Sequence, residues 1–250
     1  MKIISWNVNG LRSIYKKGFL DWLGESGADI VCLQEVRAHQ DQLTPDLVKP
    51  ENYKVCFNPA IKKGYAGTAV YTKKKPLIIE KEMGIKRFDQ EGRMLKLKYP
   101  EFTLINLYLP HGGRQKENLD YKLEVYQYLL NYLEKIKNEN LILLGDFNIA
   151  HKEIDLARPK ENKNNIMFTP EERKQIDKII DLGFTDTFRK FHKEEGYYTW
   201  WPYFANARER NLGWRIDYAF VTKTLTSKLK EAFILHKVMG SDHCPIGIEI

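Results

Sequence analysis

The sequence of 250 residues is poor in cysteine, and its three cysteines lie far apart. Cys32, Cys56 and Cys244 include no C-x-x-C pair, and their odd number leaves at least one unpaired. This pattern predicts reduced thiols in an intracellular protein rather than a disulfide framework. A zinc site needs four ligands at closer spacing, so the adjacent His243 and Cys244 do not indicate one.

Long apolar runs are also missing, and the longest are short stretches such as Leu141–Leu144. A stretch of this length cannot span a bilayer. The first residues, from Lys2 to Val8, have the pattern of a strand and lack the apolar core and cleavage site of a signal peptide. We therefore expect a cytoplasmic protein with no membrane partner. No extension for protein partners is visible, so we expect a monomer without an obligate protein partner.

No Pro- or Ser-rich linker divides the chain, and strand-like and helical segments are mixed along its whole length. This order favours two packed sheets flanked by helices over a regular βαβ series, in a single α/β domain over residues 1–250. Short apolar runs rich in β-branched residues predict strands at Lys2–Val8, Asp29–Gln34, Thr68–Thr72, Met94–Tyr99, Thr103–Leu109, Leu141–Gly145, Ile216–Val221 and Ile246–Ile250.

Two longer segments have the periodicity of helices. The first carries an apolar stripe at spacings of four and three, formed by Leu119, Leu123, Tyr126, Leu130 and Leu133. The second begins with Thr169 as its N-cap and Glu172 three residues later, and Gly183 is a natural stop. Its apolar residues are Ile176, Ile179 and Ile180.

The balance of charge is positive, with a formal net charge of +7. A basic protein of this size favours a polyanionic partner if carboxylates converge within its positive surface. The segment from Arg158 to Asn165 is too polar for a core element, so we expect a solvated loop. Asn and Lys at this density also suit contact with phosphates.

Several predicted strands lead into polar residues of the kinds that bind metal or phosphate. Asn7, Glu35, Tyr108 and Asp146 stand at the ends of such runs, and Ser241–His243 precedes the last one. Rigid scaffolds present functional side chains at strand ends. Any one of these could be an ordinary strand terminus, but five together predict an active site.

The residue types indicate what this site could do. Glu35 and Asn7 offer the hard oxygen ligands that suit Mg²⁺. Asp146 and Asn148 are two residues apart, so their side chains would point the same way on an extended segment. Such a pair can hold a water molecule, because the carboxylate accepts its proton while the amide orients it.

His243 can stabilise charge on a phosphoryl oxygen if it is cationic. For this it needs a carboxylate at its other ring nitrogen, and either Asp217 or Asp242 could serve. A lone histidine near a chain end is more often structural, but the Asp-His-Cys-Pro context of this one is hard to explain by packing.

Five blocks of the sequence carry a family resemblance, namely Ser5–Arg12, Leu33–Glu35, Gly145–Asn148, Gly213–Tyr218 and Gly240–Pro245. In this order they resemble the exonuclease III class of apurinic/apyrimidinic endonucleases, within the endonuclease/exonuclease/phosphatase superfamily. The resemblance extends from residue 3 to the end of the chain. The Asp-x-Asn motif alone marks only the superfamily, whereas its combination with the Gly-Trp-Arg-Ile-Asp-Tyr motif of residues 213–218 and with Asn206–Arg208 is specific to the class.

The resemblance implies a four-layered α/β sandwich, with two mixed, mostly antiparallel sheets packed face to face and flanked by helices. It implies a DNA-repair hydrolase that uses Mg²⁺, with Mn²⁺ able to substitute. This enzyme would cut double-stranded DNA 5′ to abasic sites and leave a 3′-hydroxyl and a 5′-deoxyribose phosphate. Further activities in the class are 3′→5′ exonuclease, 3′-end cleaning and nicking beside uracil.

The resemblance also implies roles for residues. Asp146 would activate the attacking water with help from Asn148, and Tyr108 and His243, oriented by Asp217, would contact the scissile phosphate. The implied metal residues are Glu35, Asn7 and Asp242, the last as a second-shell or alternative carboxylate. The residues implied to contact DNA or line the pocket for the abasic sugar are Arg12, Lys17, Tyr65, Arg93, His111, Arg114, Asn162, Asn165, Trp200, Trp214 and Ile216.

Four positions depart from the class. Asn9 replaces an aspartate found near the metal in some relatives, which removes one charge. His111 and Arg158 replace amide residues of phosphate-contacting loops. Trp200 is bulkier than the phenylalanine common at its position, which bears on the size of the pocket.

Two other readings compete with a repair endonuclease. One is a phosphatase of the same superfamily that acts on lipids or inositol phosphates, against which the basic charge and the tryptophan pocket argue. The other is an inactive relative that only binds nucleic acid. Such a protein would lack a carboxylate or histidine of the site, whereas Glu35, Asp146, Asp217, Asp242 and His243 are all present.

Overall fold

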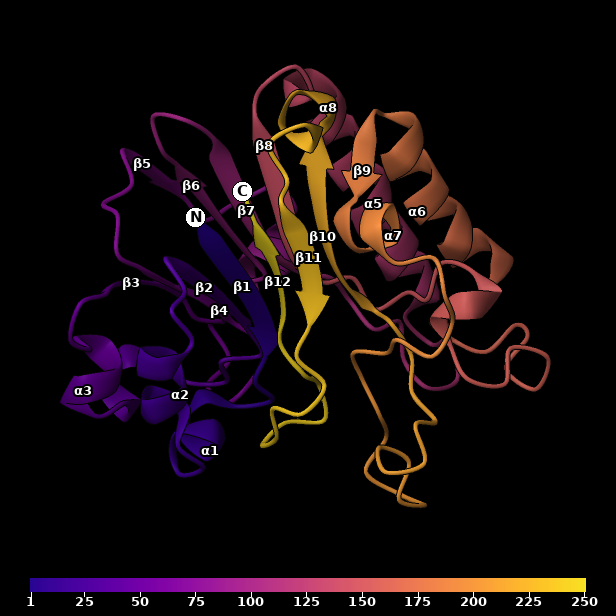
Figure 1. The fold of residues 1–250 in the computed structure, drawn as a ribbon, viewed down its shortest axis with the longest axis horizontal. Coiled ribbons are helices and arrows are strands. Elements are labelled where there is room, and N and C mark those ends of the chain that lie inside the picture. Colours follow the sequence, from indigo (N-terminus) through magenta and orange to yellow (C-terminus); the bar gives the residue numbers. More distant parts are fainter.

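The computed structural model describes residues 1–250 and contains two six-stranded sheets (Figure 1). From edge to edge, the first sheet is β11 (Glu231–Ile234), β12 (Ile246–Glu249), β1 (Lys2–Asn7), β2 (Ile30–Gln34), β4 (Thr68–Thr72) and β3 (Lys54–Asn58). The second is β5 (Ile78–Glu80), β6 (Met94–Lys98), β7 (Thr103–Tyr108), β8 (Leu141–Asp146), β10 (Asp217–Thr222) and β9 (Phe184–Asp186).

Each sheet contains one parallel pair, and all other neighbouring strands are antiparallel. The parallel pairs are β1 with β2 and β7 with β8. Because parallel strands end at the same edge of a sheet, each pair brings two carboxyl ends together. This arrangement confirms two mixed, mostly antiparallel sheets.

Helices cover the outer face of each sheet. The first sheet is covered by α1 (Leu11–Tyr15), α2 (Phe19–Glu25) and α3 (Pro45–Val48), and the second by α5 (Leu119–Ile136) and α6 (Pro170–Asp181). The remaining elements are α4 (Lys86–Gln90), α7 (Thr187–Phe191), α8 (Lys223–Thr226) and two 3₁₀ turns, η1 (Gln40–Gln42) and η2 (Glu153–Asp155). The four-layered sandwich is therefore confirmed.

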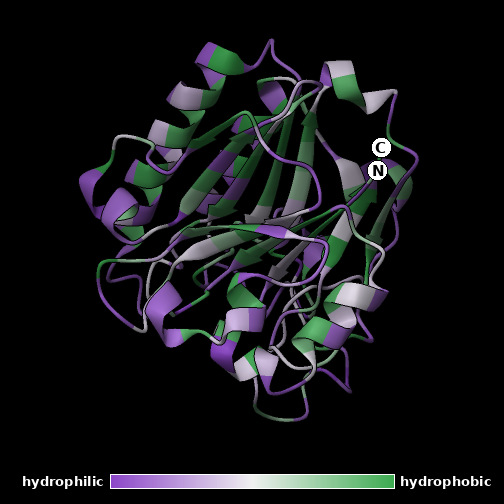
Figure 2. Ribbon diagram, turned by 90° about the vertical axis from the view of Figure 1, so that its left-hand side faces the viewer, coloured by the Kyte–Doolittle hydropathy of each residue, from purple (hydrophilic) through white to green (hydrophobic).

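An apolar core fills the space between the two sheets. Alternate residues of a strand face opposite sides of its sheet. In β7, Leu104 accordingly packs between the sheets, while Ile105 packs beneath α5. Figure 2 shows the strands mostly in hydrophobic colours and many connecting loops in hydrophilic ones. The sandwich gives the site a rigid base, because strands from both sheets are locked by this core.

The strands expected from the sequence are the eight inner strands of the two sheets, and their ends agree within about two residues. The four strands that the pattern did not reveal are the four edges, β3, β5, β9 and β11. The edge strands are short, with three to five residues each, and short edge strands are common in natural sheets. β5, for example, contains only Ile78, Ile79 and Glu80, and two isoleucines alone are too short a run to predict a strand.

The buried face of α5 differs from the expected stripe. Lys122 is fully buried, whereas Leu119 and Leu123 are only partly so. The Lys122 ammonium can lie inside because it donates to Glu172 at 2.5 Å and to the carbonyls of Asn148 at 2.7 Å and His111 at 3.1 Å. A buried charge is tolerated when it is paired and hydrogen-bonded.

The start of α6 forms the capping box that its sequence predicts. The Glu172 N–H donates to the Thr169 hydroxyl at 3.2 Å, and the Thr169 N–H donates to the Glu172 carboxylate at 3.0 Å. Gly183 follows the helix with φ of +97°, as a helix stop requires. Ile180 was expected on the apolar face but is exposed, because the helix presents Gln175, Ile176 and Ile179 to the core instead.

The two ends of the chain lie side by side (Figure 1), where the Met1 ammonium donates to the Ile250 carbonyl at 2.6 Å. Among the helices, none combines the length and the hydropathy needed to cross a membrane.

Replacing Lys122 with methionine should destabilise the fold by about 3 to 5 kcal/mol, because Glu172 is left buried without its partner. Urea unfolding followed by circular dichroism measures this change. Lys135→Met on the exposed side of the same helix is the matched control and should stay within about 0.5 kcal/mol of the parent. The double change Lys122→Met with Glu172→Gln should recover part of the loss. Equal stability of the two single lysine variants would contradict this account of α5.

Candidate active site

The polar residues at the strand ends meet at one edge of the sandwich. β1 ends on Asn7, β7 on Tyr108 and β8 on Asp146, while Glu35 directly follows β2. β10 runs antiparallel to β8, and Asp217 at its start pairs in register with Asp146. The site therefore takes residues from both sheets.

A buried cluster of Asp146, Asp217 and His243 lies at the centre of this edge. His243 Nδ1 is 2.9 Å from Asp217 Oδ2, and His243 Nε2 is 3.9 Å from Asp146 Oδ2. Of the two carboxylates that could orient the histidine, Asp217 is thus the one in contact. One oxygen of each carboxylate and one ring nitrogen lie within 4.8 Å of one another.

The charges of this cluster depend on one another. Burial would lower the pKa of His243, but Asp217, Asp146 and Asp242 raise it to about 10. Burial raises the pKa of Asp146 to about 7, with Asp217 and Glu35 adding to the rise, while His243 and the hydrogen bond from Asn7 oppose it. The cluster therefore holds a cationic imidazole beside a carboxyl group that can take up a proton near neutral pH.

Asn7, Glu35 and Tyr108 form the other side of the site. Asn7 Nδ2 donates to Asp146 Oδ2 at 2.9 Å, and Asn7 Oδ1 accepts the N–H of Asn9 at 3.0 Å. The Tyr108 hydroxyl donates to Glu35 Oε1. Burial and the nearby Glu35 hold the pKa of Tyr108 well above its usual value, so the phenol remains a donor.

Asn148 does not lie on an extended segment, so the prediction of an extended backbone from Asp146 to Asn148 is wrong. Its φ is +52°, and its N–H donates to Asp146 Oδ1 at 2.9 Å while Nδ2 donates to the Leu109 carbonyl at 3.0 Å. The two residues are still in contact, through this turn. Gly145 precedes them because a Cβ there would lie 1.9 Å from the Leu107 carbonyl oxygen.

The site has free oxygen atoms that suit a divalent cation. Asp217 Oδ1 is buried without a hydrogen-bond partner. Glu35 accepts hydrogen bonds from Tyr108 and Arg37 on Oε1 alone, which leaves Oε2 open. A cation would also stabilise the ionised form of the buried Asp146. Hard carboxylate oxygens of this kind are typical Mg²⁺ ligands.

Asp242 fits its expected role as a metal residue less well than the carboxylates with free oxygen atoms, because both of its own oxygens accept hydrogen bonds. Asn9 Nδ2 donates to its Oδ1 at 2.8 Å, and Trp200 Nε1 donates to its Oδ2 at 3.1 Å. The geometric cluster that could hold an ion contains Asp146, Asp217 and His243 instead of Asp242.

Two buried cations of the site were not recognised from the sequence as functional. Lys122 holds the carbonyls of Asn148 and His111, and so fixes two loops of the site. Its only sequence signal is a lysine within the apolar periodicity of α5. Arg215 Nε donates to Asp155 at 2.7 Å, and its NH2 group donates to Asp186 at 2.8 Å.

The Arg215 contacts hold the segment that leads into Asp217. The Arg215 N–H donates to the Asp155 carbonyl at 2.6 Å, and the N–H groups of Ile216 and Asp217 both donate to the Thr199 hydroxyl at 3.1 Å. These bonds explain why Asp217 enters β10 in the register that faces Asp146.

A cleft of about 810 Å³ opens beside the cluster. Aromatic residues and cationic or amide side chains share its lining, which is the expected composition of a site for a sugar-phosphate chain. The expected DNA-contacting residues that line it are His111, Arg114, Asn162, Asn165, Trp200 and Trp214. The polar stretch from Arg158 to Asn165 forms a loop along it, as expected.

The other expected DNA-contacting residues lie outside this cleft. Arg12 and Lys17 are exposed, whereas Arg93 is only 4% exposed and is paired with Glu91 at 2.5 Å. Arg93 also donates to the Tyr65 hydroxyl at 3.2 Å, so it supports Tyr65 instead of reaching a phosphate itself. Ile216 is 1% exposed and packs behind Trp214, so it does not line the cleft.

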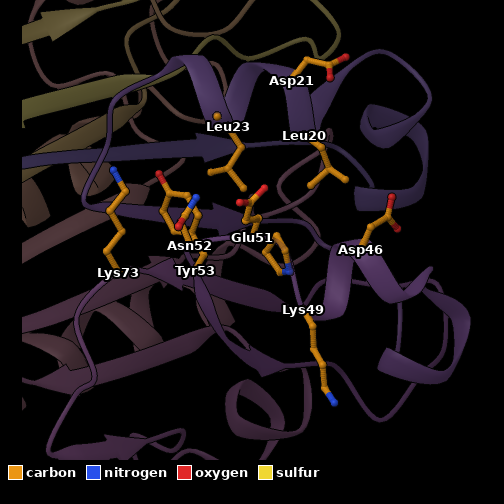
Figure 3. Close-up of a pocket in the computed structure, with 11 residues that line it drawn as sticks. Leu20, Asp21, Leu23, Asp46, Lys49, Glu51, Asn52, Tyr53 and Lys73 are labelled. Atoms are coloured by element: carbon orange, nitrogen blue, oxygen red, sulfur yellow. The ribbon is translucent and has the colours of Figure 1, made fainter.

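A second hollow, of about 750 Å³, lies between α2 and the residues that follow α3 (Figure 3). Its lining mixes acidic side chains such as Asp46 and Glu51 with Lys49 and Lys73. None of the residues expected in the active site lines it.

The protein has a buried cluster of histidine and carboxylate side chains at the strand ends of a four-layered sandwich, and a basic cleft lies beside it. These features define the class of the protein as a hydrolase of phosphate esters. A sequence profile of the Endonuclease/Exonuclease/phosphatase family matches residues 4–243. The chain belongs to this family and, within it, to the exonuclease III type of apurinic/apyrimidinic endonuclease.

The similar proteins share nearly the whole chain. An exodeoxyribonuclease of Bacillus subtilis is 45% identical over 253 residues, which cover 100% of this chain and 99% of that one. The structure of an AP endonuclease from Archaeoglobus fulgidus superposes with a TM-score of 0.92 at 30% identity and the same coverage. A Neisseria 3′ phosphatase bound to a product DNA hairpin gives a TM-score of 0.92 at 27% identity, again with 100% and 99% coverage.

The stability of the site's frame should depend on pH through Asp155. Burial would raise its pKa, but Arg215 and Arg189 lower it to about 2, against about 3.9 in the unfolded chain. A lowered folded-state pKa contributes stability above the unfolded value and loses it as the pH falls. We expect about 2 to 3 kcal/mol at pH 7, lost between about pH 5 and pH 2.

Urea unfolding of the parent and of Asp155→Asn at several pH values measures this contribution. The gap between the two proteins should narrow steadily below about pH 5. Asp41→Asn changes an exposed carboxylate and is the control, with little effect at any pH. A gap that stays constant down to pH 2 would show that Asp155 is not the group responsible.

Proposed function

We propose that this protein hydrolyses the phosphodiester bond 5′ to abasic sites in double-stranded DNA and leaves a 3′-hydroxyl and a 5′-deoxyribose phosphate. The observation that carries the proposal is the buried Asp146–Asp217–His243 cluster beside a cleft lined by two tryptophans and by Arg114, Asn162 and Asn165. We also propose that residues 1–250 act as one catalytic domain, because the site takes residues from both sheets.

The residues of the cluster suit hydrolysis. Asp146, with a pKa near 7, accepts the proton of a water molecule that attacks the phosphorus in line with the departing 3′ oxygen. Asn148 orients this water from the turn that follows β8. The cationic His243, held by Asp217, donates from Nε2 to a phosphoryl oxygen as negative charge grows there. Tyr108 donates to the same phosphate when its hydroxyl turns from Glu35.

Glu35 and Asn7 would hold Mg²⁺, with Mn²⁺ as a substitute. When bound, the ion supplies positive charge that offsets the charge on the phosphate and the leaving oxygen. Glu35 is suited to this because Oε2 carries no protein hydrogen bond, and Asn7 because its Oδ1 retains a second lone pair.

The lining of the cleft supports the proposed preference for abasic sites. A nucleotide without a base has little stacking to lose, so its extrusion from the duplex costs less than that of an intact one. Trp200 and Trp214 form a T-shaped pair with ring centres 6.5 Å apart, which offers an apolar wall to a bare sugar. Arg114, His111 and the Arg158–Asn165 loop lie where phosphates would follow.

Nicking of an end-labelled duplex with one stable abasic analogue tests this function. With Mg²⁺ we expect a cut 5′ to the analogue that a chelator abolishes. Asp146→Asn should lower the rate by about 10² to 10⁴-fold, because general-base help is lost. Asp181→Asn, at the end of α6 and remote from the site, is the matched control and should cut at the parent rate.

Duplexes with a uracil, an undamaged sequence or a 3′-phosphate end complete the assay. Cutting of these would add uracil nicking, exonuclease or end-cleaning activity, the last two suggested by the relatives named exodeoxyribonuclease and 3′ phosphatase. Duplex binding by the folded protein without a cut under any divalent metal would contradict the enzymatic proposal and favour a binding module.

Binding to DNA should weaken with salt, because cationic side chains release counterions from phosphates. We expect Arg114→Ala to reduce the slope of log K against log salt by about 1, the change due to one phosphate contact. Fluorescence anisotropy of a labelled abasic duplex with chelator present measures this slope. Arg210→Ala, which removes another cation that lines the cleft, serves for comparison. An unchanged slope in Arg114→Ala would remove this residue from the proposed interface.

A further inference from the structure

The carboxylate of Asp242 is held between two side-chain donors that come from distant parts of the chain. Asn9 Nδ2 donates to Oδ1 at 2.8 Å, and the indole N–H of Trp200 donates to Oδ2 at 3.1 Å. Hydrogen bonds to a carboxylate are stronger than those between neutral groups, so the two donors hold the side chain firmly.

Trp200 is also tied to the site through its backbone. Its N–H donates to the Trp214 carbonyl and its carbonyl accepts the N–H of Trp214, both at 2.9 Å. The next residue, Trp201, donates its N–H to the Asp242 carbonyl at 3.0 Å. With its backbone fixed in this way, the bond to Asp242 determines how the half-buried indole is turned within the cleft.

The same bonds continue to the catalytic cluster. The Asn9 N–H donates to Asn7 Oδ1 at 3.0 Å, and Asn7 Nδ2 donates to Asp146 Oδ2 at 2.9 Å. A continuous chain of hydrogen bonds, which includes the backbone N–H of Asn9, thus joins Asp146 to the wall of the cleft. Asn9 fits this chain because an amide can donate to Asp242, which a second carboxylate could not do.

We propose that Asp242, held by Asn9, is a positioning residue that fixes the Trp200 indole as a wall of the cleft and so determines which nucleotides can enter. Phenylalanine has no donor for this carboxylate, so the arrangement requires a tryptophan at position 200. With the indole fixed, the cleft admits a base-free sugar and resists an intact nucleotide. This inference rests on the proposed function for its substrate, and on the geometry of the three side chains for its structural part.

The structural part is tested by NMR without DNA or metal. The chain has five tryptophans, so a ¹⁵N–¹H spectrum contains five indole N–H signals, and the signal lost in Trp200→Phe identifies Trp200. Asp242→Ala and Asn9→Asp should shift this signal and leave the other four in place, which also shows that the variants fold. An unmoved Trp200 signal in both variants would overturn the proposal.

The specificity part is tested by duplex binding in the presence of a chelator. The measured quantity is the ratio of the Kd for an undamaged duplex to the Kd for an abasic duplex. Trp200→Phe and Asp242→Ala should each lower this ratio by about 10-fold, the effect of one hydrogen bond to a charged acceptor. The double variant should lower it no further, since one residue acts through the other. Trp201→Phe, whose indole donates to Asn211 at 3.3 Å, is the matched control with an unchanged ratio.

A role of Asp242 as a metal ligand gives different results. Asp242→Ala would then weaken Mg²⁺ binding in calorimetry while it leaves the Trp200 signal and the binding ratio unchanged, and this outcome overturns the proposal. Additive effects in the double variant would overturn it as well. Because these measurements need no cleavage, they are distinguishable from a failure of the proposed function, which would appear only as absent nicking.

Discussion

The hydrogen bond from Asn7 to Asp146 links the ends of β1 and β8, which belong to different sheets. It can form only because the two sheets pack face to face with their parallel pairs ending at the same edge. Asn7 and Glu35 from the first sheet then face Tyr108, Asp146 and Asp217 from the second. The apolar core between the sheets sets this distance, so the position of every reactive group depends on packing far from the reaction.

Burial has a double effect on this site. It raises the pKa of Asp146 and would lower that of His243, which stays charged because the neighbouring carboxylates outweigh the effect of burial. One group is thereby prepared to take a proton and another to donate a hydrogen bond. The same burial would be costly if the supporting groups were unpaired. The fold meets this need with Lys122 against Glu172 and with Arg215 against Asp155 and Asp186. These buried ion pairs hold the loops of the site in place.

Much of the fold and of the site could be predicted from local pattern. Inner strands are buried on both faces and therefore appear in the sequence as apolar runs, while an edge strand such as β5, with two isoleucines in three residues, is too short to be recognised. The residues that end inner strands, among them Asn7 and Asp146, could be picked out for the same reason. Arg93 and Ile216 could not be placed correctly, since nothing in their neighbours along the chain shows that tertiary contacts bury them. Lys122 was missed because a lysine in a helix is exposed unless a distant partner such as Glu172 meets it.

The sequence by itself determined the inner strands, the capping of α6, the family and the set of reactive residue types. These follow from residues close together in the chain, or from motifs whose order is enough. The tertiary structure decided which carboxylate orients His243, which oxygens remain free for a metal ion and how Trp200 is turned. From the residue types alone, Asp217 and Asp242 were both candidates as partners of the histidine, and only the family resemblance implied Asp217. The register of β10 against β8 brought Asp217 to it, while Asn9 and Trp200 took Asp242. Such choices depend on distances between segments far apart in the chain, which local sequence does not encode.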